Sequence, residues 1–309
     1  MVEAVEITDS KYPKALKEAL KNLVASSGPK KLYYKGNWNA FFPADRRDPA
    51  AAGENCLAVV GSRHLTSYGR RVTEQLVTEA AASGITIVSG FMYGGDEAAH
   101  SAAVKCGGKT IAVMPCGVDI IFPPQQKELY HKILDNNGLI ISEYEPGFKP
   151  TNYSFVQRDR IVAGLCKAVL VTEAALKSGS LITANYAKKF NRKIFAVPGP
   201  ITSEVSKGTI ELIREGAEPI IEAKQILDFF KILPSAQKAS TLVKTSADKS
   251  AGKRGTLENK IIEQLKRESM KADEMARLFS TPVAQLGTTL SLMQLKGFIN
   301  SDNGKYYIN

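Results

Sequence analysis

The chain has 309 residues and a net charge of +10, with 44% hydrophobic and 23% charged residues, which is typical of a globular protein. It has no run of about 18 apolar residues, so we expect no membrane span. Its four cysteines form no C-x-x-C pair and its three histidines show no ligand spacing, so we expect no metal site. The acidic N-terminal segment lacks the apolar core of a secretory signal, and we expect a reduced, cytoplasmic protein.

The positive charge is distributed unevenly along the chain. Residues 234–255 carry five Lys or Arg against one acidic residue, whereas residues 51–233 carry twenty against eighteen. Excess positive charge favours a polyanionic partner, and in the nearly neutral central part a local cluster of cations must bind it. The alternative is a generally basic surface that only favours solubility.

Residues 1–50 are predicted to be an N-terminal helical extension. The spacing of Leu16, Leu20 and Leu23 predicts a short amphipathic helix over residues 12–24, and the sequence K-K-L-Y-Y-K-G-N-W predicts a short strand after it. A segment of this length buries too little apolar surface to fold alone, so we expect it to pack on the next domain.

Residues 51–233 alternate between strand and helix patterns. Strands are predicted at 57–60, 85–88, 110–114, 139–142, 168–172 and 193–197, with helices at 68–83, 96–106, 125–136 and 181–190. This alternation predicts an α/β fold with a doubly wound, Rossmann-like parallel sheet. Most of the predicted strands are followed by Gly, Ser or Pro. Because carboxyl ends of parallel strands share one edge of the sheet, we expect a ligand site there.

The stretch L-A-V-V-G-S-R-H-L-T-S-Y is the strongest local indication of such a site. Its buried strand ends at a turn formed by Gly61, Ser62 and Arg63, which leads into a predicted helix. Unpaired N–H groups at a helix N-terminus attract anions, and the Arg63 guanidinium is suited to phosphate. An ordinary strand–helix turn is the alternative. Ser89 and Gly90 end the next strand and are expected at the same edge of the sheet.

A second predicted anion site precedes the last helix of this region. It consists of Lys177, Ser178, Gly179 and Ser180, where either serine can cap the helix and Lys177 adds a positive charge. Because both sites follow strands of one sheet, we expect Lys177 and Arg63 to face the same crevice.

The segment F-V-Q-R-D-R places Phe155 close to Arg158 and Arg160. An aromatic ring among cations suits single-stranded nucleic acid, because the ring stacks on bases while the cations hold the phosphate backbone. Alternatively, the two arginines pair with Asp159 or Glu173 and have a structural role.

Residues 234–255 are polar and rich in lysine, which predicts a flexible basic linker. Beyond it, helices are predicted at 256–267, 271–279 and 282–296. Asn303-Gly304 between two apolar runs predicts a β-hairpin, so that residues 256–309 are expected to form a winged-helix domain. Its expected recognition helix offers only Lys296 as a cation, which argues against strong binding in a major groove.

The motifs of several common enzyme classes are absent from the sequence. It contains no G-x-G-x-x-G dinucleotide fingerprint, no P-loop and no G-x-S-x-G elbow. We therefore expect neither catalytic residues nor a cofactor.

Taken together, the motifs resemble the DprA/Smf family of DNA-processing proteins. The resemblance covers nearly the whole chain and rests on V-G-S-R-x-x-x-x-Y-G (60–69), S-G-x-x-x-G-x-D-x-x-A-H (89–100), G-G-K-T-I-A-V (107–113), S-E-Y-E-P-G (142–147), F-V-Q-R-D-R-I-V-A-G-L (155–165), K-S-G-S-L-I-T-A (177–184) and V-P-G (197–199). It implies a non-enzymatic homodimer that binds and protects single-stranded DNA. It further implies that the protein helps to load the RecA recombinase during DNA uptake and recombination in natural transformation.

Two stretches depart from the pattern of that family. The family usually has Ala-x-Gly-Ile-Asp where this chain has M-Y-G-G-D (92–96), and Arg-Asn-Arg where this chain has Arg158, Asp159 and Arg160. An acidic residue inside the cationic segment should weaken contact with a DNA backbone unless it only pairs locally.

Two other functions remain as alternatives. A Rossmann-like nucleotide sensor or phosphoribohydrolase would bind free nucleotide or release a base, but such enzymes carry P-G-G-x-G-T where this chain has P-G-P-I-T (198–202). A regulator acting through the winged helix would bind duplex DNA more tightly than a single strand.

Overall fold

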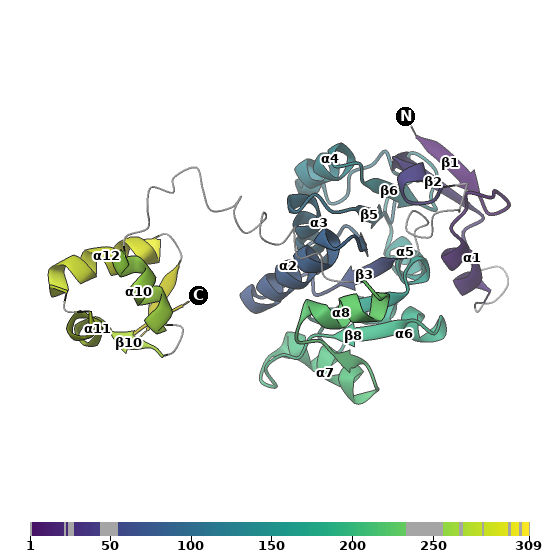
Figure 1. The fold of residues 1–309 in the computed structure, drawn as a ribbon. Helices are drawn as coiled ribbons and strands as arrows, with labels where there is room; N and C mark the ends of the chain where they lie inside the picture. The colour runs from purple at the N-terminus through teal and green to yellow at the C-terminus, as the bar shows by residue number, and fades with distance from the viewer. Residues whose placement is uncertain are drawn as a thin grey trace. The chain divides into compact units, whose positions relative to one another are not determined.

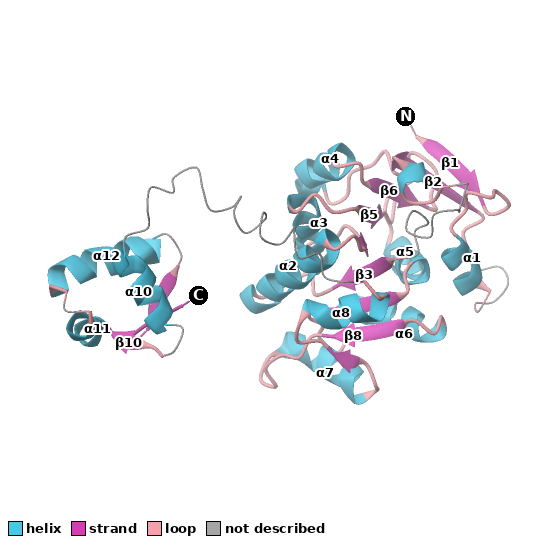
Figure 2. Ribbon diagram, viewed as in Figure 1, coloured by secondary structure: helices cyan, strands magenta, loops and turns pink. Residues whose placement is uncertain are grey.

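The computed structural model describes residues 2–21, 23, 28–43, 55–232, 256–265, 268–279, 281–295, 298–302 and 305–308. The chain divides into two compact units, residues 1–242 and 243–309. Figure 1 follows the path of the chain, and Figure 2 marks its helices and strands. No described helix is both long enough and apolar enough to cross a membrane.

Within the described residues, the first unit is built on one nine-stranded sheet. Its strands are β1 (Glu3–Glu6), β2 (Lys31–Gly36), β3 (Cys56–Val60), β4 (Thr86–Ser89), β5 (Thr110–Val113), β6 (Leu139–Ser142), β7 (Ala168–Val171), β8 (Lys193–Ala196) and β9 (Glu218–Pro219). They are arranged in the order β1-β2-β6-β5-β4-β3-β7-β8-β9. From β6 to β9 neighbouring strands are parallel, whereas β2 is antiparallel to both β6 and β1.

Helices cover both faces of this sheet. They are α1 (Lys14–Leu20), α2 (Ser67–Ala82), α3 (Gly95–Lys105), α4 (Lys127–Asp135), α5 (Asn152–Leu165), α6 (Ser180–Lys189), α7 (Lys207–Arg214) and α8 (Ala223–Phe230). Helices α2, α3, α4 and α8 pack on one face, and α1, α5, α6 and α7 on the other. Both faces of the strands are therefore apolar, which explains the nearly continuous hydrophobic runs in the sequence. The predicted α/β fold with a large, mostly parallel Rossmann-like sheet is confirmed.

The order of the strands creates a switch point between β3 and β7. From β3 the chain adds β4, β5 and β6 on one side, and it then returns to add β7, β8 and β9 on the other side of β3. The helices that follow β3 and β7, α2 and α6, therefore lie on opposite faces of the sheet. Such a reversal opens a crevice at the carboxyl ends of the two strands.

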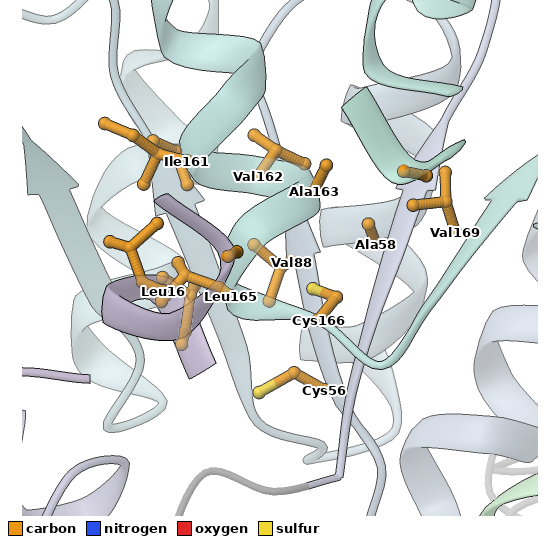
Figure 3. Close-up of a cluster of buried hydrophobic side chains, with 14 of the residues drawn as sticks. Leu16, Cys56, Ala58, Val88, Ile161, Val162, Ala163, Leu165, Cys166 and Val169 are labelled. Carbon is orange, nitrogen blue, oxygen red and sulfur yellow. The ribbon is translucent and has the colours of Figure 1, made fainter. Parts of the chain in front are cut away.

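The N-terminal segment is part of this core. Strand β2 pairs with β6, and α1 packs against α5, as Figure 3 shows for Leu16 beside Ile161 and Leu165. A side-chain Cβ at Gly164 would lie 2.7 Å from the Leu16 Cδ1 atom, so the glycine permits this close contact. Helix α1 covers only part of the predicted range 12–24, and it begins directly after Pro13.

The six predicted strands of the central region are confirmed to within one or two residues, as are its four predicted helices. Strands β1 and β9 and helices α5, α7 and α8 were not among the predicted elements. Helix α5 escapes the usual pattern because it buries Arg158 and Arg160 together with its apolar residues. A search for apolar residues at helical spacing does not find such a helix.

The second unit contains three helices and a three-stranded antiparallel sheet within its described residues. These are α10 (Thr256–Leu265), α11 (Ala272–Leu278), α12 (Val283–Leu295), β10 (Met270–Lys271), β11 (Ile299–Asp302) and β12 (Lys305–Ile308). Strands β11 and β12 pair as the predicted hairpin, around a core that includes Ile261, Leu286 and Leu290. Its predicted turn at Asn303-Gly304, Lys296 and the predicted linker 234–255 lie outside the described residues.

Candidate nucleic-acid interface

The carboxyl ends of β3 and β7 border a pocket of about 430 Å³ at the switch point. We call it the switch-point pocket. It is lined by the turn after β3, the start of α3, one face of α5 and the segment that leads into α6. The lining residues are Val60, Gly61, Ser62, Arg63, His64, Met92, Asp96, Phe155, Val156, Arg158, Asp159, Ala175, Lys177, Ser178, Gly179, Ser180, Ile182 and Thr183.

Most of the predicted site residues line this one pocket. They are Gly61, Ser62, Arg63, Phe155, Arg158, Lys177, Ser178, Gly179 and Ser180. As expected, Arg63 and Lys177 face the same crevice although 114 positions separate them in the numbering. Ser89, Gly90 and Arg160 are not lining residues. Ser89 is fully buried and its hydroxyl donates to the Val59 carbonyl, 2.6 Å away.

The N-terminus of α2 is already occupied by a carboxylate of the protein itself. Glu173, only 3% exposed, accepts hydrogen bonds from the Thr66 N–H at 2.9 Å and the Thr66 hydroxyl at 2.5 Å. The Glu173 carbonyl accepts from the Ser62 N–H at 2.7 Å, and the Thr66 hydroxyl accepts from the Gly69 N–H. The expectation that this helix N-terminus offers unpaired N–H groups to an external anion is therefore wrong at Ser62, Thr66 and Gly69, because an internal acceptor satisfies each of them.

The turn after β3 also lies directly against the start of α3. A Cβ at Gly95 would lie 2.6 Å from the Cα of Gly61, and the Gly95 N–H donates to the Ser62 carbonyl at 3.0 Å. Gly94 has a φ of +75° and would bring a Cβ onto the Ser62 carbonyl oxygen. The two glycines of the unusual M-Y-G-G-D sequence thus allow two backbone segments to touch.

Arg158 is turned into the sheet and is only 4% exposed. Its guanidinium donates to the carbonyl of Val113 at 2.9 Å and to the carbonyl of Gly90, at the ends of β5 and β4. A Cβ at Gly90 would overlap this guanidinium, so Gly90 serves the arginine and not a ligand. Arg158 lines the pocket while its Nη1 atom donates to two backbone carbonyls inside the protein, and its buried Nε atom makes no hydrogen bond.

Two carboxylates accompany Arg158 in the lining of the pocket. Asp159 lies 3.0 Å from the Arg158 Nε atom, and Asp96, 7% exposed, accepts from the Met92 N–H at 3.2 Å. Burial raises the pKa of Asp159 to about 7 against the lowering effect of Arg158, and nearby Asp96 adds to the rise. Burial likewise raises the pKa of Asp96, although Arg158 lowers it. Asp159 therefore pairs locally and also lines the pocket.

Arg160 lies on a different side of α5, away from the pocket. It is 4% exposed, and both terminal nitrogens contact the Glu143 carboxylate, at 2.8 and 2.6 Å. Arg160 therefore has the structural role that the sequence left open as an alternative. Its partner is Glu143, not Asp159 or Glu173 as that alternative expected. The predicted placement of Arg160 at a DNA-binding surface is contradicted by this burial.

The segment before α6 presents a more open arrangement than the start of α2. Lys177 is exposed and has no salt bridge among the described residues. The cap position is Gly179, which makes no side-chain hydrogen bond, while the Ser178 and Ser180 hydroxyls lie 2.8 Å apart. The N–H groups of Ser180, Leu181 and Ile182 are bonded within this turn, to the Ser178 hydroxyl and to the carbonyls of Ser178 and Gly179. Lys177, the two hydroxyls and the positive end of the helix dipole are therefore the groups here that favour an anion.

Arg63 stands over the aromatic ring of Phe155, with its Cζ atom 5.4 Å from the ring centroid. The ring also contacts Phe122, at a centroid distance of 5.7 Å. Arg63 is exposed and makes no salt bridge in the described part of the chain. Phe155 is therefore not a bare platform for a base. It holds the Arg63 guanidinium in place at the mouth of the pocket.

Sequence reasoning missed Asp96, His64 and the role of Glu173. Asp96 had a local signal, since it follows the second strand within the motif S-G-x-x-x-G-x-D. Glu173 follows β7 directly, but only the fold shows that it reaches the start of α2. Within the described residues, no three His, Cys, Asp or Glu side chains are placed to hold a metal ion.

Comparison with known proteins places this fold and site in a family. Residues 3–231 match the model of the family described as DNA recombination-mediator protein A. The chain is 34% identical over 325 residues to Protein Smf of Synechocystis, covering 97% of this chain and 78% of that protein.

Two solved structures are similar to it. DNA processing protein A of Streptococcus pneumoniae superposes with a TM-score of 0.65 at 37% identity, covering 74% of each chain. DNA processing protein A of Helicobacter pylori, described for its single-stranded DNA binding mode, gives a TM-score of 0.62 at 32% identity, covering 75% of this chain and 96% of that one. With the family model matching most of its length, this chain belongs to the DNA recombination-mediator protein A family.

Proposed function

We propose that the chain is a non-enzymatic, cytoplasmic recombination mediator that binds single-stranded DNA in the switch-point pocket. The observation that carries this proposal is the convergence of Arg63 and Lys177, two exposed cations without salt bridges among the described residues, on one pocket. Support also comes from the family match and from the Helicobacter pylori relative described as binding single-stranded DNA.

Each part of the pocket has a role in this proposal. Lys177 and the Ser178 and Ser180 hydroxyls hold one phosphate at the start of α6. Arg63, supported by Phe155, holds a second phosphate or stacks its guanidinium on a base. A flexible single strand can bend its backbone into a recessed pocket, whereas a duplex is stiff over this length.

Arg158 and Arg160 are assigned to the fold in this proposal. The Arg158 Nη1 atom donates to backbone carbonyls and its Nε atom lies in an ion pair with Asp159, while Arg160 pairs with Glu143. Moving either group to a phosphate would break a buried ion pair, which costs about 3–5 kcal/mol when one partner is left unpaired.

The proposal extends to the second unit and to protein partners. We propose that residues 256–309 are a winged-helix domain joined by a flexible linker over 234–255. Helix α12 has no charged residue between Val283 and Leu295, so we do not expect it to read duplex DNA. Homodimer formation and the loading of RecA during natural transformation are proposed from the family resemblance alone.

The test compares matched labelled oligonucleotides, single-stranded and duplex, in fluorescence anisotropy titrations of the full chain over a salt series. We expect tighter binding to the single strand and a negative slope of log affinity against log salt concentration. Lys224→Ala serves as the control, because this exposed lysine on α8 does not line the pocket. Equal or tighter binding to duplex would contradict the proposal. Preferential binding of free nucleotide, or release of a base, would instead favour the nucleotide-binding alternative.

A further inference from the structure

The switch-point pocket contains two carboxylates as well as its cations. Asp96 and Asp159 line it together with Arg63 and Arg158. A pocket for polyanions with two ionised carboxylates would repel the ligand it is proposed to bind. The charge state of these carboxylates therefore decides how well the pocket binds phosphate.

Of the two carboxylates, Asp159 is the one whose pKa the surrounding groups bring close to neutral pH. Three elements bring charged groups to it: α5 brings Arg158, at 3.0 Å, α3 brings Asp96, and the turn after β3 brings Arg63. The like charge of Asp96 and burial in the pocket oppose ionisation, while the two arginines favour it. The balance leaves the pKa of Asp159 at about 7.

Asp96 differs from Asp159 in that its carboxylate is hydrogen-bonded to the backbone. Its Oδ2 atom accepts from the Met92 N–H at 3.2 Å. Asp159 has an ion pair with Arg158, which is already committed to the carbonyls of Gly90 and Val113.

We propose that Asp159 makes DNA binding in the switch-point pocket proton-linked, with a proton from solvent taken up on this carboxylate when a phosphate enters. The inference rests on the proposed function of the pocket. With Asp96 ionised, uptake of one proton by Asp159 changes the summed charge of the two arginines and two aspartates from zero to +1. The proton thus neutralises the group that opposes the incoming phosphate.

Linkage fixes the sign and the pH range of the effect. A nearby phosphate raises the pKa of Asp159 in the complex above its value in the free protein, so the complex binds the proton more tightly. A rise of about one pKa unit corresponds to about a tenfold gain in affinity. The gain appears as the pH falls toward about 7 and levels off below that value, where the free protein is also protonated.

His64 is a second titratable group that lines the same pocket. A histidine that gains positive charge at low pH would also strengthen phosphate binding, so the two residues must be separated by substitution. Asp159→Asn removes the ionisable group with little change in shape, and His64→Gln does so at the other position. Glu128→Gln changes an exposed carboxylate that does not line the pocket and serves as the matched control.

The experiment measures the dissociation constant of the full chain for a labelled oligothymidylate from about pH 6 to about pH 9 at constant ionic strength, a range that brackets the expected titration. We expect the unsubstituted protein, His64→Gln and Glu128→Gln to gain about fivefold in affinity between about pH 9 and 7, and close to tenfold by about pH 6. Asp159→Asn should show a flat profile and bind at high pH almost as tightly as the unsubstituted protein does at neutral pH.

Each other outcome has a definite meaning. An unchanged profile in Asp159→Asn, or a flat profile in His64→Gln alone, overturns the inference and leaves DNA binding intact. A flat profile in the unsubstituted protein also overturns the inference and leaves DNA binding intact. Absence of single-strand binding at every pH overturns the proposed function and the inference with it.

A second measurement covers the case in which Asp159→Asn does not fold. Calorimetric titration of the unsubstituted protein with the same oligonucleotide, in two buffers of different ionisation enthalpy at about pH 8, gives the number of protons taken up on binding. We expect uptake of a substantial fraction of one proton. An uptake of zero overturns the inference.

Discussion

The starts of α2 and α6 look alike in sequence and differ in the folded protein. Each helix follows a buried strand and a short segment of Gly, Ser and a basic residue. At α2 the buried Glu173 carboxylate satisfies the Thr66 N–H and hydroxyl. At α6 the N–H groups of Ser180, Leu181 and Ile182 are bonded to the Ser178 hydroxyl and to the carbonyls of Ser178 and Gly179, and Lys177 is exposed beside them. One helix start holds a carboxylate of the protein, and at the other the exposed Lys177 remains available to an external anion.

The difference shows that the fold decides which groups near a helix start remain available to an external anion. Glu173 follows β7, the strand that leads to α6, and it serves the helix that follows β3. Because β3 and β7 are hydrogen-bonded neighbours, the residue that closes one site comes from the strand that leads to the other. The comparison can be tested from both sides.

The largest expected effect follows from removing the internal anion. Glu173→Ala removes the carboxylate that accepts from the Thr66 N–H and hydroxyl and opens a cavity at a buried position, so we expect the free energy of unfolding to fall by about 3 kcal/mol. Chemical denaturation monitored by circular dichroism measures this change. Glu173→Gln, which retains one acceptor oxygen, should cost less. If Glu173→Ala left stability unchanged but weakened single-strand binding, Glu173 would belong to the interface and the comparison would fail.

Removing the cations that line the pocket should weaken DNA binding and leave stability nearly unchanged, which is the opposite of the effect expected for Glu173→Ala. Arg63→Ala and Lys177→Ala should each weaken single-strand binding by about 1.5–3 kcal/mol, or about ten- to a hundredfold, because one charge-assisted phosphate contact is lost. Stability should change little, since neither side chain belongs to the core. The slope of log affinity against log salt should become less negative by about 0.7 for each contact removed.

Anisotropy titrations measure the affinity and salt slope of the two variants, and thermal unfolding measures their stability, with Lys224→Ala as the control. Unchanged salt slopes in both variants would remove Arg63 and Lys177 from the interface. A lower melting temperature with an unchanged slope for Arg63→Ala would make this residue structural.

A smaller effect is expected in the dependence of stability on pH. The pKa of Asp159 is raised to about 7 in the folded protein, so the folded state binds this proton more tightly than the unfolded state does. The stability that this residue contributes is therefore fully present at acid pH below its unfolded pKa of about 3.9 and is lost as the pH rises through about 7. Denaturation of the unsubstituted protein and of Asp159→Asn across this range should show a difference that changes with pH. A constant difference would mean that Asp159 titrates normally.

The smallest effect is expected from deletion of the second unit. Truncation after residue 232 keeps every residue that lines the switch-point pocket, and the second unit has its own hydrophobic core. We expect a soluble, cooperatively folding protein whose single-strand affinity changes by less than about threefold, or about 0.6 kcal/mol. Gel filtration and the anisotropy assay measure the two properties. Aggregation, or loss of most of the affinity, would show that residues beyond 232 contribute to the fold or the site.

Helix α5 shows where local sequence patterns stop being informative. Its segment F-V-Q-R-D-R suggested an exposed cationic surface, yet Arg158 and Arg160 are each only 4% exposed. Besides local partners such as Asp159, they contact the carbonyls of Gly90 and Val113 and the carboxylate of Glu143, which are distant in sequence. An arginine is buried only where the fold supplies partners for its guanidinium. Partners that are distant in sequence cannot be predicted from the local sequence pattern.

The sequence by itself determined most of the strands and helices and the edge of the sheet at which a ligand site should lie. Hydrophobic runs and the Gly, Ser and Pro residues after them are local properties, because they follow from which side chains and backbone conformations a segment can accommodate. Only the tertiary structure decided that β3 and β7 are neighbours, and hence that Arg63 and Lys177 line one pocket. It also decided that Glu173 closes the start of α2 and that Asp159 faces the pocket. Strand order and the burial of charge depend on contacts between residues far apart in the chain, and the free energy of those contacts exists only once the sheet has formed.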